Sequence, residues 1–115
     1  MTDRGRSDLL QGTLEMLVLK TLSLEAMHGW GISQRIRGMS RGVFDVNQGS
    51  LYPALQRMKR KGWIWSAWRV TENKRRARYY ELTPAGRRQL VAESEQWAEA
   101  SGAVNRILRF AAGEV

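Results

Sequence analysis

The sequence predicts a mainly α-helical fold with one small β-hairpin, in which three helices are followed by the hairpin and by a long C-terminal helix. Two observations support this prediction. Apolar residues recur at helical spacing before residue 62 and again after residue 83. Between these regions, two short stretches rich in aromatic and β-branched residues flank a polar, basic turn. With 115 residues, the chain can form one domain with its own core plus one added element.

The first helix is expected over residues 9–24, after a polar and flexible N-terminus over residues 1–8. Its main apolar stripe consists of Leu10, Leu14, Leu17, Val18 and Leu22. A second apolar set, Leu9, Met16 and Leu19, lies on another side of this helix. Because one small core does not need both sets, we expect the second set to contact another protein surface.

A second helix is expected from about Trp30 to Met39, ended by the polar and glycine-rich residues that follow. We expect it to bury Trp30, Met39 and one of two isoleucines, Ile32 or Ile36. A brief extended segment over residues 43–46 then leads to the next helix.

A third helix is expected to begin at the N-cap Asn47, to reach Lys61 and to be terminated by Gly62. Pro53 conflicts with this start, because a proline beyond the first turn removes a backbone hydrogen bond. Ser50 is therefore an alternative N-cap, and the boundary stays open. The stripe predicted to face the core is formed by Leu51, Leu55 and Met58.

Residues 63–70 and 77–82 are predicted to form the two strands of a β-hairpin. The alternation of side chains directs Ile64, Tyr80 and Leu82 toward the core. The alternating residues Trp63, Trp65, Tyr79 and Glu81 then lie outside or on a second surface. At the tip, four cations occur within five residues, namely Lys74, Arg75, Arg76 and Arg78.

Thr83 and Pro84 mark the start of the last helix as its N-cap and first residue, and Gly113 is expected to end it after Ala112. Such a helix is about 40 Å long, which exceeds the width of a domain of this size. A repeat of seven residues along it suits packing between two chains. The dimer interface is therefore predicted to contain Leu9, Met16, Leu19, Leu90, Trp97, Val104 and Leu108. These elements divide the chain into a compact domain over 9–82 and a dimerisation helix over 83–115.

The chain carries 19 Lys and Arg residues against 11 Asp and Glu residues, which gives a formal net charge of +8. This excess favours a polyanionic partner, nucleic acid before an anionic membrane. Three helices followed by a basic hairpin match the plan of a winged helix-turn-helix, which places a helix in the major groove of DNA and the hairpin on the neighbouring backbone. The residues expected to contact double-stranded DNA are Gln48, Ser50, Tyr52, Gln56, Arg57, Arg60, Lys74, Arg75, Arg76 and Arg78.

Four segments of the chain are distinctive in combination: LQGTLEMLVL at 10–19, HGWGI at 28–32, GSLYPAL at 49–55 with GWI at 62–64, and RYYELTPAGR at 78–87. In this order they closely resemble the PadR family of bacterial transcriptional regulators, over residues 10 to about 97. Only Trp63 and the arginine-rich tip depart from the usual pattern. The short C-terminal helix is similar to that of the compact subgroup of the family.

The resemblance implies a homodimer, usually a repressor, that binds inverted-repeat operators through the third helix and the hairpin, or wing. It also implies that the first and last helices form the dimer interface. Matching positions place Ser50, Tyr52 and Pro53 in the recognition-helix motif and residues 74–78 in the wing. Some similar regulators bind flat aromatic effectors through a tryptophan of the last helix, which makes Trp97 a candidate ligand contact; the alternative is that Trp97 is simply a large interface residue.

Other classes of function are disfavoured. The chain has no cysteine, a single histidine, His28, and neither a glycine-rich phosphate loop nor a spaced set of metal ligands, so we expect no enzyme, cofactor or metal. No apolar run is long enough for a membrane span and the N-terminus lacks a signal sequence, so a cytoplasmic location is expected. A winged helix used only for protein contacts, and RNA binding, remain alternatives to DNA binding.

Overall fold

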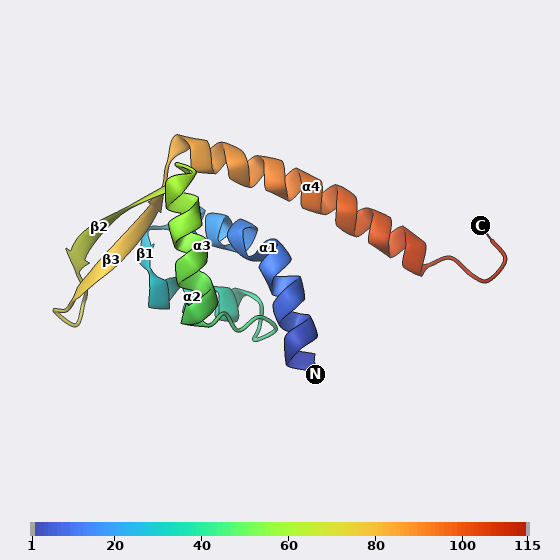
Figure 1. Cartoon of the computed structure of the whole chain (residues 1–115), viewed down its shortest axis with the longest axis horizontal. Helices are drawn as coiled ribbons and strands as arrows, with labels where there is room; N and C mark the ends of the chain where they lie inside the picture. Colours follow the sequence, from blue (N-terminus) through green and yellow to red (C-terminus); the bar gives the residue numbers. More distant parts are fainter. Residues whose placement is uncertain (1, 115) are drawn as a thin grey trace.

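Over residues 2–114, which the computed structural model describes with side chains from residue 13 onward, the chain forms four helices and a three-stranded antiparallel sheet (Figure 1). The mainly α-helical fold with a small hairpin is therefore confirmed. In chain order the elements are α1 (Thr2–Leu24), β1 (Met27–His28), α2 (Gly29–Met39), α3 (Gln48–Arg60), β2 (Ile64–Val70), β3 (Arg76–Leu82) and α4 (Pro84–Leu108).

The hydrophobic core lies between α1, α2, α3 and the base of the hairpin. The predicted inner faces of α3 and of the hairpin are confirmed, since all of their members are buried. The core side chains of the helices are Leu14, Val18, Leu19, Leu22, Ile32, Ile36, Leu51, Ala54, Leu55 and Met58, and those of the hairpin are Ile64, Tyr80 and Leu82. Burial of such side chains is the main stabilising contribution to a domain of this size.

The prediction for α2 is wrong for two of its residues. Both isoleucines, Ile32 and Ile36, are buried, whereas Trp30 is 64% exposed and Met39 is 48% exposed. The helix is short, and its buried stripe consists of Gly29, Ile32, Ser33 and Ile36. Trp30 lies outside that stripe, and Met39 lies in the last turn at the edge of the core. The large apolar side chain of Trp30 is thus left at the surface.

Leu19 does not lie on an intermolecular surface. Its side chain is 0% exposed within the single chain, so its assignment to the dimer interface is wrong. The reason is that α1 is the central helix, packed against α2, α3 and β3 as well as α4, and therefore needs apolar residues on more than one side. Met16 is half-buried, and the side chain of Leu9 lies outside the described residues.

Strand β1 was not expected from the sequence. It pairs with β3 through Met27 opposite Tyr80 and His28 opposite Tyr79, so the sheet order is β1-β3-β2. His28 also caps α2, because its Nδ1 atom accepts a hydrogen bond from the backbone N–H of Gly31 at 3.0 Å. This short pairing ties the N-terminal end of α2 to the hairpin.

Several element boundaries differ from the expected ones. α1 already begins at Thr2, in polar residues that apolar spacing does not detect, and the segment over residues 43–46 belongs to no helix or strand. Asn47 caps α3, with its Oδ1 accepting the N–H of Ser50 at 2.8 Å, and Pro53 lies inside the helix. α4 ends at Leu108 instead of Ala112, and Gly113 adopts a positive φ in the turn that follows.

The base of the hairpin and the start of α4 are joined by a tight set of backbone contacts. Thr83 donates its backbone N–H to the Trp63 carbonyl at 3.0 Å and its hydroxyl to the Gly62 carbonyl at 2.6 Å. The Thr83 hydroxyl in turn accepts a hydrogen bond from the N–H of Gly86 at 3.0 Å. Thr83 is thus the N-cap of α4, as predicted. A Cβ atom on Gly86 would lie 2.1 Å from the Trp63 carbonyl oxygen, so only glycine fits at this position.

We expect Gly86→Ala to destabilise the protein by about 3 kcal/mol or more, because the new methyl group collides with backbone atoms that hold the hairpin. Gly38→Ala is the matched control, since a Cβ at that helical position meets nothing within 4 Å. The control should stabilise by about 0.5–1 kcal/mol, as alanine favours a helix over glycine. Urea unfolding measures both changes, and equal stabilities for the two variants would contradict the packing described.

Candidate nucleic-acid interface

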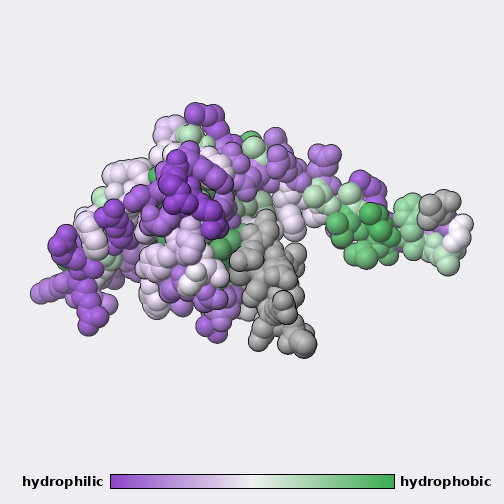
Figure 2. Space-filling model, in the orientation of Figure 1, coloured by the Kyte–Doolittle hydropathy of each residue, from purple (hydrophilic) through white to green (hydrophobic). Residues whose placement is uncertain are grey.

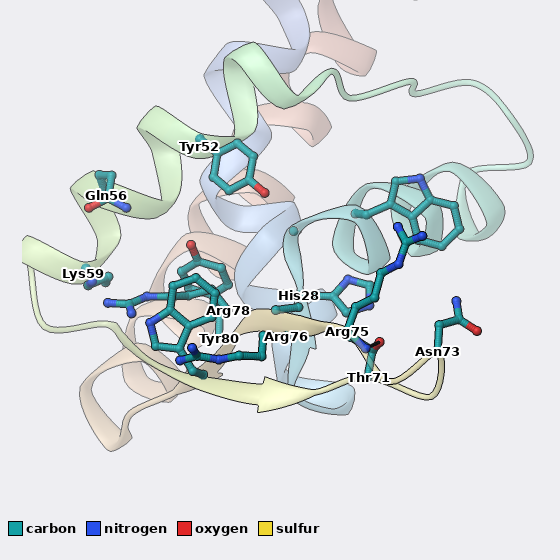
Figure 3. A pocket seen from close by; sticks show the side chains of 14 residues that line it. His28, Tyr52, Gln56, Lys59, Thr71, Asn73, Arg75, Arg76, Arg78 and Tyr80 are labelled. Carbon is teal, nitrogen blue, oxygen red and sulfur yellow. Dashed lines mark hydrogen bonds between the residues drawn. The ribbon is translucent and has the colours of Figure 1, made fainter.

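A cleft of about 840 Å³ separates the exposed face of α3 from the β2–β3 hairpin (Figure 3). Three parts of the chain line it. The first turn of α2 and the residue before it contribute His28, Gly29 and Trp30; α3 contributes Tyr52, Gln56 and Lys59; and the hairpin contributes Trp68, Thr71, Asn73, Arg75, Arg76, Ala77, Arg78 and Tyr80.

The lining of the cleft is cationic and aromatic. Lys59, Arg75, Arg76 and Arg78 contribute four positive charges, and none of the lining residues given above is an aspartate or a glutamate. A concave surface with charges of one sign raises the local concentration of ions of the other sign. The cleft is therefore suited to a phosphate-bearing partner.

The register of the hairpin explains how these cations reach the cleft. On β3, Leu82, Tyr80, Arg78 and Arg76 share one face, opposite Ile64, Ser66, Trp68 and Val70 of β2 in that order. At the base of the hairpin this face is buried in the core, as Ile64 and Leu82 are. Toward the tip the same face leaves the core and lines the cleft with Arg78 and Arg76.

The turn at the tip is closed by three bonds. Thr71 donates its N–H to the Arg75 carbonyl at 2.7 Å, and Lys74 donates its N–H to the Thr71 carbonyl at 2.9 Å. The Thr71 hydroxyl accepts the N–H of Arg75 at 3.3 Å. Lys74 adopts a left-handed backbone with φ of 60° and is exposed at the tip, outside the lining of the cleft.

Helix α3 faces the cleft through residues on one side. Tyr52 and Gln56, both predicted to contact DNA, lie one turn apart, and Lys59 follows in the next turn (Figure 3). Lys59 lies outside the predicted inner face of this helix and was therefore free for solvent or DNA, but it was not among the residues expected to contact DNA; its spacing of four and then three residues from Tyr52 places it on the same side. These three residues are the part of α3 that the fold directs toward the hairpin.

The other predicted residues of α3 lie elsewhere on the helix. Gln48 donates its side-chain N–H to the Ser33 hydroxyl at 3.0 Å and so holds α3 against α2. Ser50 is half-buried near the N-terminus of the helix. Pro53 and Arg60 are exposed but do not line the cleft.

Arg57 is engaged within the protein. Its Nε atom donates to Glu15 of α1 at 3.0 Å, and Lys61 Nζ approaches the other oxygen of the same carboxylate at 3.4 Å. Glu15 therefore links α1 to the C-terminal part of α3. Sequence analysis missed this role of Glu15, because no local pattern connects residues separated by more than 40 positions.

Tyr80 forms the floor of the cleft next to the core. Burial raises the pKa of its hydroxyl above the ordinary value, and the neighbouring Tyr52 adds to this effect, whereas Arg78 opposes it. Tyr80 therefore stays neutral at physiological pH. The first turn of α2 packs closely here, since a Cβ on Gly29 would lie 3.0 Å from the Tyr52 hydroxyl oxygen.

Two other kinds of site are absent from the described residues. No group of three or more His, Cys, Asp or Glu side chains in residues 13–114 is placed to hold a metal ion. In the same part of the chain, no helix combines the length and the apolar character that crossing a membrane requires.

Residues 18–92 match the model of the transcriptional regulator PadR-like family. The chain belongs to this family. The match covers the end of α1, all of α2 and α3, the hairpin and the start of α4. Members of the PadR-like family regulate transcription. The cleft is therefore part of a protein from a class of DNA-binding regulators.

Two solved structures and a curated relative to which the chain is similar are described as transcriptional regulators. A transcriptional regulator from Clostridium thermocellum is similar with a TM-score of 0.81 and 26% identity, over 89% of this chain and 99% of that one. A PadR-like transcriptional regulator from Bacillus cereus has a TM-score of 0.79 and 29% identity, over 90% and 99% of the two chains. A transcriptional regulator from Mycobacterium tuberculosis is 37% identical over 58% of this chain and 59% of its own length.

In this PadR-like chain we expect Glu15 and Arg57 to contribute to stability as a pair. A double-mutant cycle with Glu15→Ala and Arg57→Ala should give a coupling energy of about 0.5–1 kcal/mol, because the pair is partly exposed. Urea unfolding of the four proteins measures it. The same cycle with Arg60, which is exposed without a carboxylate partner among residues 13–114, should give no coupling with Glu15. Absence of coupling between Glu15 and Arg57 would show that the pair does not stabilise the fold.

Proposed function

We propose that this chain is a sequence-specific transcriptional regulator, a homodimeric repressor that binds an inverted-repeat operator in double-stranded DNA. The observation that carries this proposal is the cleft between α3 and the wing, which brings four cations together without a carboxylate among its lining residues. Membership of the PadR-like family supports the same function.

In the proposed complex, α3 enters the major groove with its cleft-facing side toward the bases. The amide of Gln56 can pair with an adenine edge, and the hydroxyl of Tyr52, an exposed residue, can donate to a phosphate. Gln48 and Ser50 lie in the first turn of α3, the helix end that favours phosphate, and Pro53 lies in the second turn. We do not assign base contacts to Arg57, because Glu15 holds its side chain against α1.

The wing supplies contacts to the DNA backbone in this proposal. Arg75, Arg76 and Arg78 line the cleft, and Lys74 extends from the tip. Contacts of cations with phosphates fix the position of a protein on the duplex and carry no sequence information by themselves. Sequence preference is therefore expected from α3, and overall affinity from the wing.

A titration of the protein against a labelled duplex from its own upstream promoter, and against a scrambled duplex, tests this function at several salt concentrations. We expect tighter binding to the promoter duplex. Arg75→Ala with Arg76→Ala should weaken binding to both duplexes similarly and lower the salt slope by about 0.9 for each phosphate that the variant no longer neutralises.

The matched control removes two exposed arginines outside the cleft, Arg87 and Arg88 of α4, and so makes the same change in net charge. This variant should keep most of the affinity and the slope. If removing the wing arginines has no larger effect than the control, the wing does not bind DNA. Absence of any binding to duplex DNA would instead favour a module for protein contacts, and preference for duplex RNA would favour an RNA-binding role.

The homodimer is proposed from the C-terminal half of α4. This helix packs on α1 near its start, where Leu90 contacts the core, and then extends beyond the rest of the body (Figure 1). Figure 2 shows apolar residues gathered near its far end. The exposed large apolar residues in this half are Trp97, Val104, Ile107 and Leu108, followed by Phe110. A helix with such a surface finds apolar cover in a second chain.

A charge in this surface should separate the chains. We expect Trp97→Glu to convert a dimer of twice 13.2 kDa into a monomer, as measured by light scattering, because burial of an unpaired carboxylate is costly. Glu95→Gln, an exposed change two residues away in α4, should leave the dimer intact. A dimer that persists in Trp97→Glu would move the interface to another surface.

Release of the repressor by a small molecule or a stress signal is part of the proposal. Trp97 is exposed in the single chain and lies on the helix proposed for dimerisation, which suits a flat aromatic effector bound between two chains. The alternative role of Trp97 is to fill the interface as a large side chain. Because the proposed function requires access to chromosomal DNA, a cytoplasmic location is part of the proposal.

A further inference from the structure

We propose that Trp68 is a positioning residue for DNA binding, which orders the guanidinium groups of Arg76 and Arg78 in the cleft before DNA arrives. The inference rests on the proposed function, since it concerns how the wing binds phosphate. In the sequence, neither the spacing nor the charges of the wing residues predict this role of Trp68.

The geometry places one indole ring against two arginines. The guanidinium carbon of Arg76 lies 5.0 Å from the centre of the Trp68 ring, and that of Arg78 lies 5.3 Å from it. Trp68 is directly opposite Arg78 in the β2–β3 register, and Arg76 is two residues further on the same face. Cation–π attraction acts when the cation lies within about 6 Å of the ring centre, and both distances are shorter than this.

Packing of the core does not explain Trp68. The side chain is 56% exposed and lies outside the core cluster, in the outer half of the hairpin. An exposed tryptophan contributes little by burial, whereas its ring face attracts guanidinium groups electrostatically. The main described contacts of the ring are thus the two arginines that line the cleft.

On the opposite face of the hairpin, the arginine has a different set of contacts. There, Arg69 contacts the ring of Tyr79 at 5.2 Å but also approaches the carboxylate of Glu81 at 3.5 Å, which neutralises its charge. Among residues 13–114, Arg76 and Arg78 have no such carboxylate partner. Stacking on Trp68 therefore restrains these two side chains while leaving their charge and N–H groups available to phosphate.

Ordering of this kind strengthens binding without adding a contact. A free arginine side chain loses rotamer freedom when it binds, and this loss opposes association. If Trp68 restricts Arg76 and Arg78 beforehand, part of that cost is absent from the binding step. Removal of the ring should thus weaken binding while the number of phosphate contacts, and hence the salt slope, stays the same.

The experiment measures binding of a labelled duplex of random sequence by anisotropy over a range of salt concentrations. We expect Trp68→Leu to weaken binding about tenfold, which corresponds to about 1.4 kcal/mol, with an unchanged salt slope. Trp68→Phe keeps a ring face but lacks the indole N–H, and should restore most of the affinity. In the background R76Q/R78Q, Trp68→Leu should have no further effect.

The matched control is Trp65→Leu, which removes an exposed tryptophan from the same strand but from the other face. It should bind as the unchanged protein does. Three results would each overturn the proposal: unchanged affinity in Trp68→Leu, failure of Trp68→Phe to restore binding, or the same loss in the R76Q/R78Q background. The second would show that the indole N–H contacts DNA, and the third that Trp68 acts independently of the two arginines.

A measurement without DNA separates this proposal from the proposed function. The ring current of Trp68 should shift the side-chain proton resonances of Arg76 and Arg78 in the free protein, and Trp68→Leu should abolish the shifts. Shifts in a protein that binds no DNA would refute the proposed function and leave the stacking intact. Absence of the shifts in a protein that binds DNA would overturn the role of Trp68 alone.

Discussion

The close approach of the Trp63 carbonyl to Gly86 fixes where the two functional parts of the chain separate. At this point the hairpin leaves the core and α4 begins, and Thr83 bonds to both sides of the junction. A side chain on Gly86 would push α4 away from β2 and would disturb the alignment of the hairpin. The direction of the wing and the direction of α4 are thus set by one contact between backbone atoms, which tolerates no Cβ.

From that junction outward, one face of the hairpin serves two purposes. Its base completes the core through Ile64 and Leu82, and its outer part forms a wall of the cleft through Trp68, Arg76 and Arg78. Because side chains alternate along a strand, a shift in register by one residue would turn both sets to the other face. Burial of the base therefore enforces the presentation of the arginines, so the stability of the fold and the geometry of the cleft depend on the same strand pairing.

Periodic patterns predicted most of this architecture. The inner face of α3, the core face of the hairpin and the N-caps Asn47 and Thr83 follow from local sequence, since each depends on residues close together in the chain. What local sequence could not reveal depends on distant partners. Strand β1 is only two residues long and forms because its backbone pairs with β3, which is distant in sequence. Leu19 is buried because α1 is covered on several sides, and Trp30 is exposed because α2 buries only one narrow stripe.

The contacts of the candidate site could not be predicted from local sequence either, most clearly on α3. There the sequence shows a cluster of cations but does not show which residues they contact. The fold divides this cluster, directing Lys59 to the cleft while Glu15 of α1 holds Arg57 and Lys61. Since the contacts of α4 with the domain are mainly with α1 and β3, α1 lies between the helix proposed for dimerisation and the recognition helix. The carboxylate of Glu15 connects α1 to the C-terminal part of α3 through its ion pairs with Arg57 and Lys61. The orientation of α3 is therefore tied, through α1, to the packing of α4, which in the proposed dimer would set the distance between the two α3 helices.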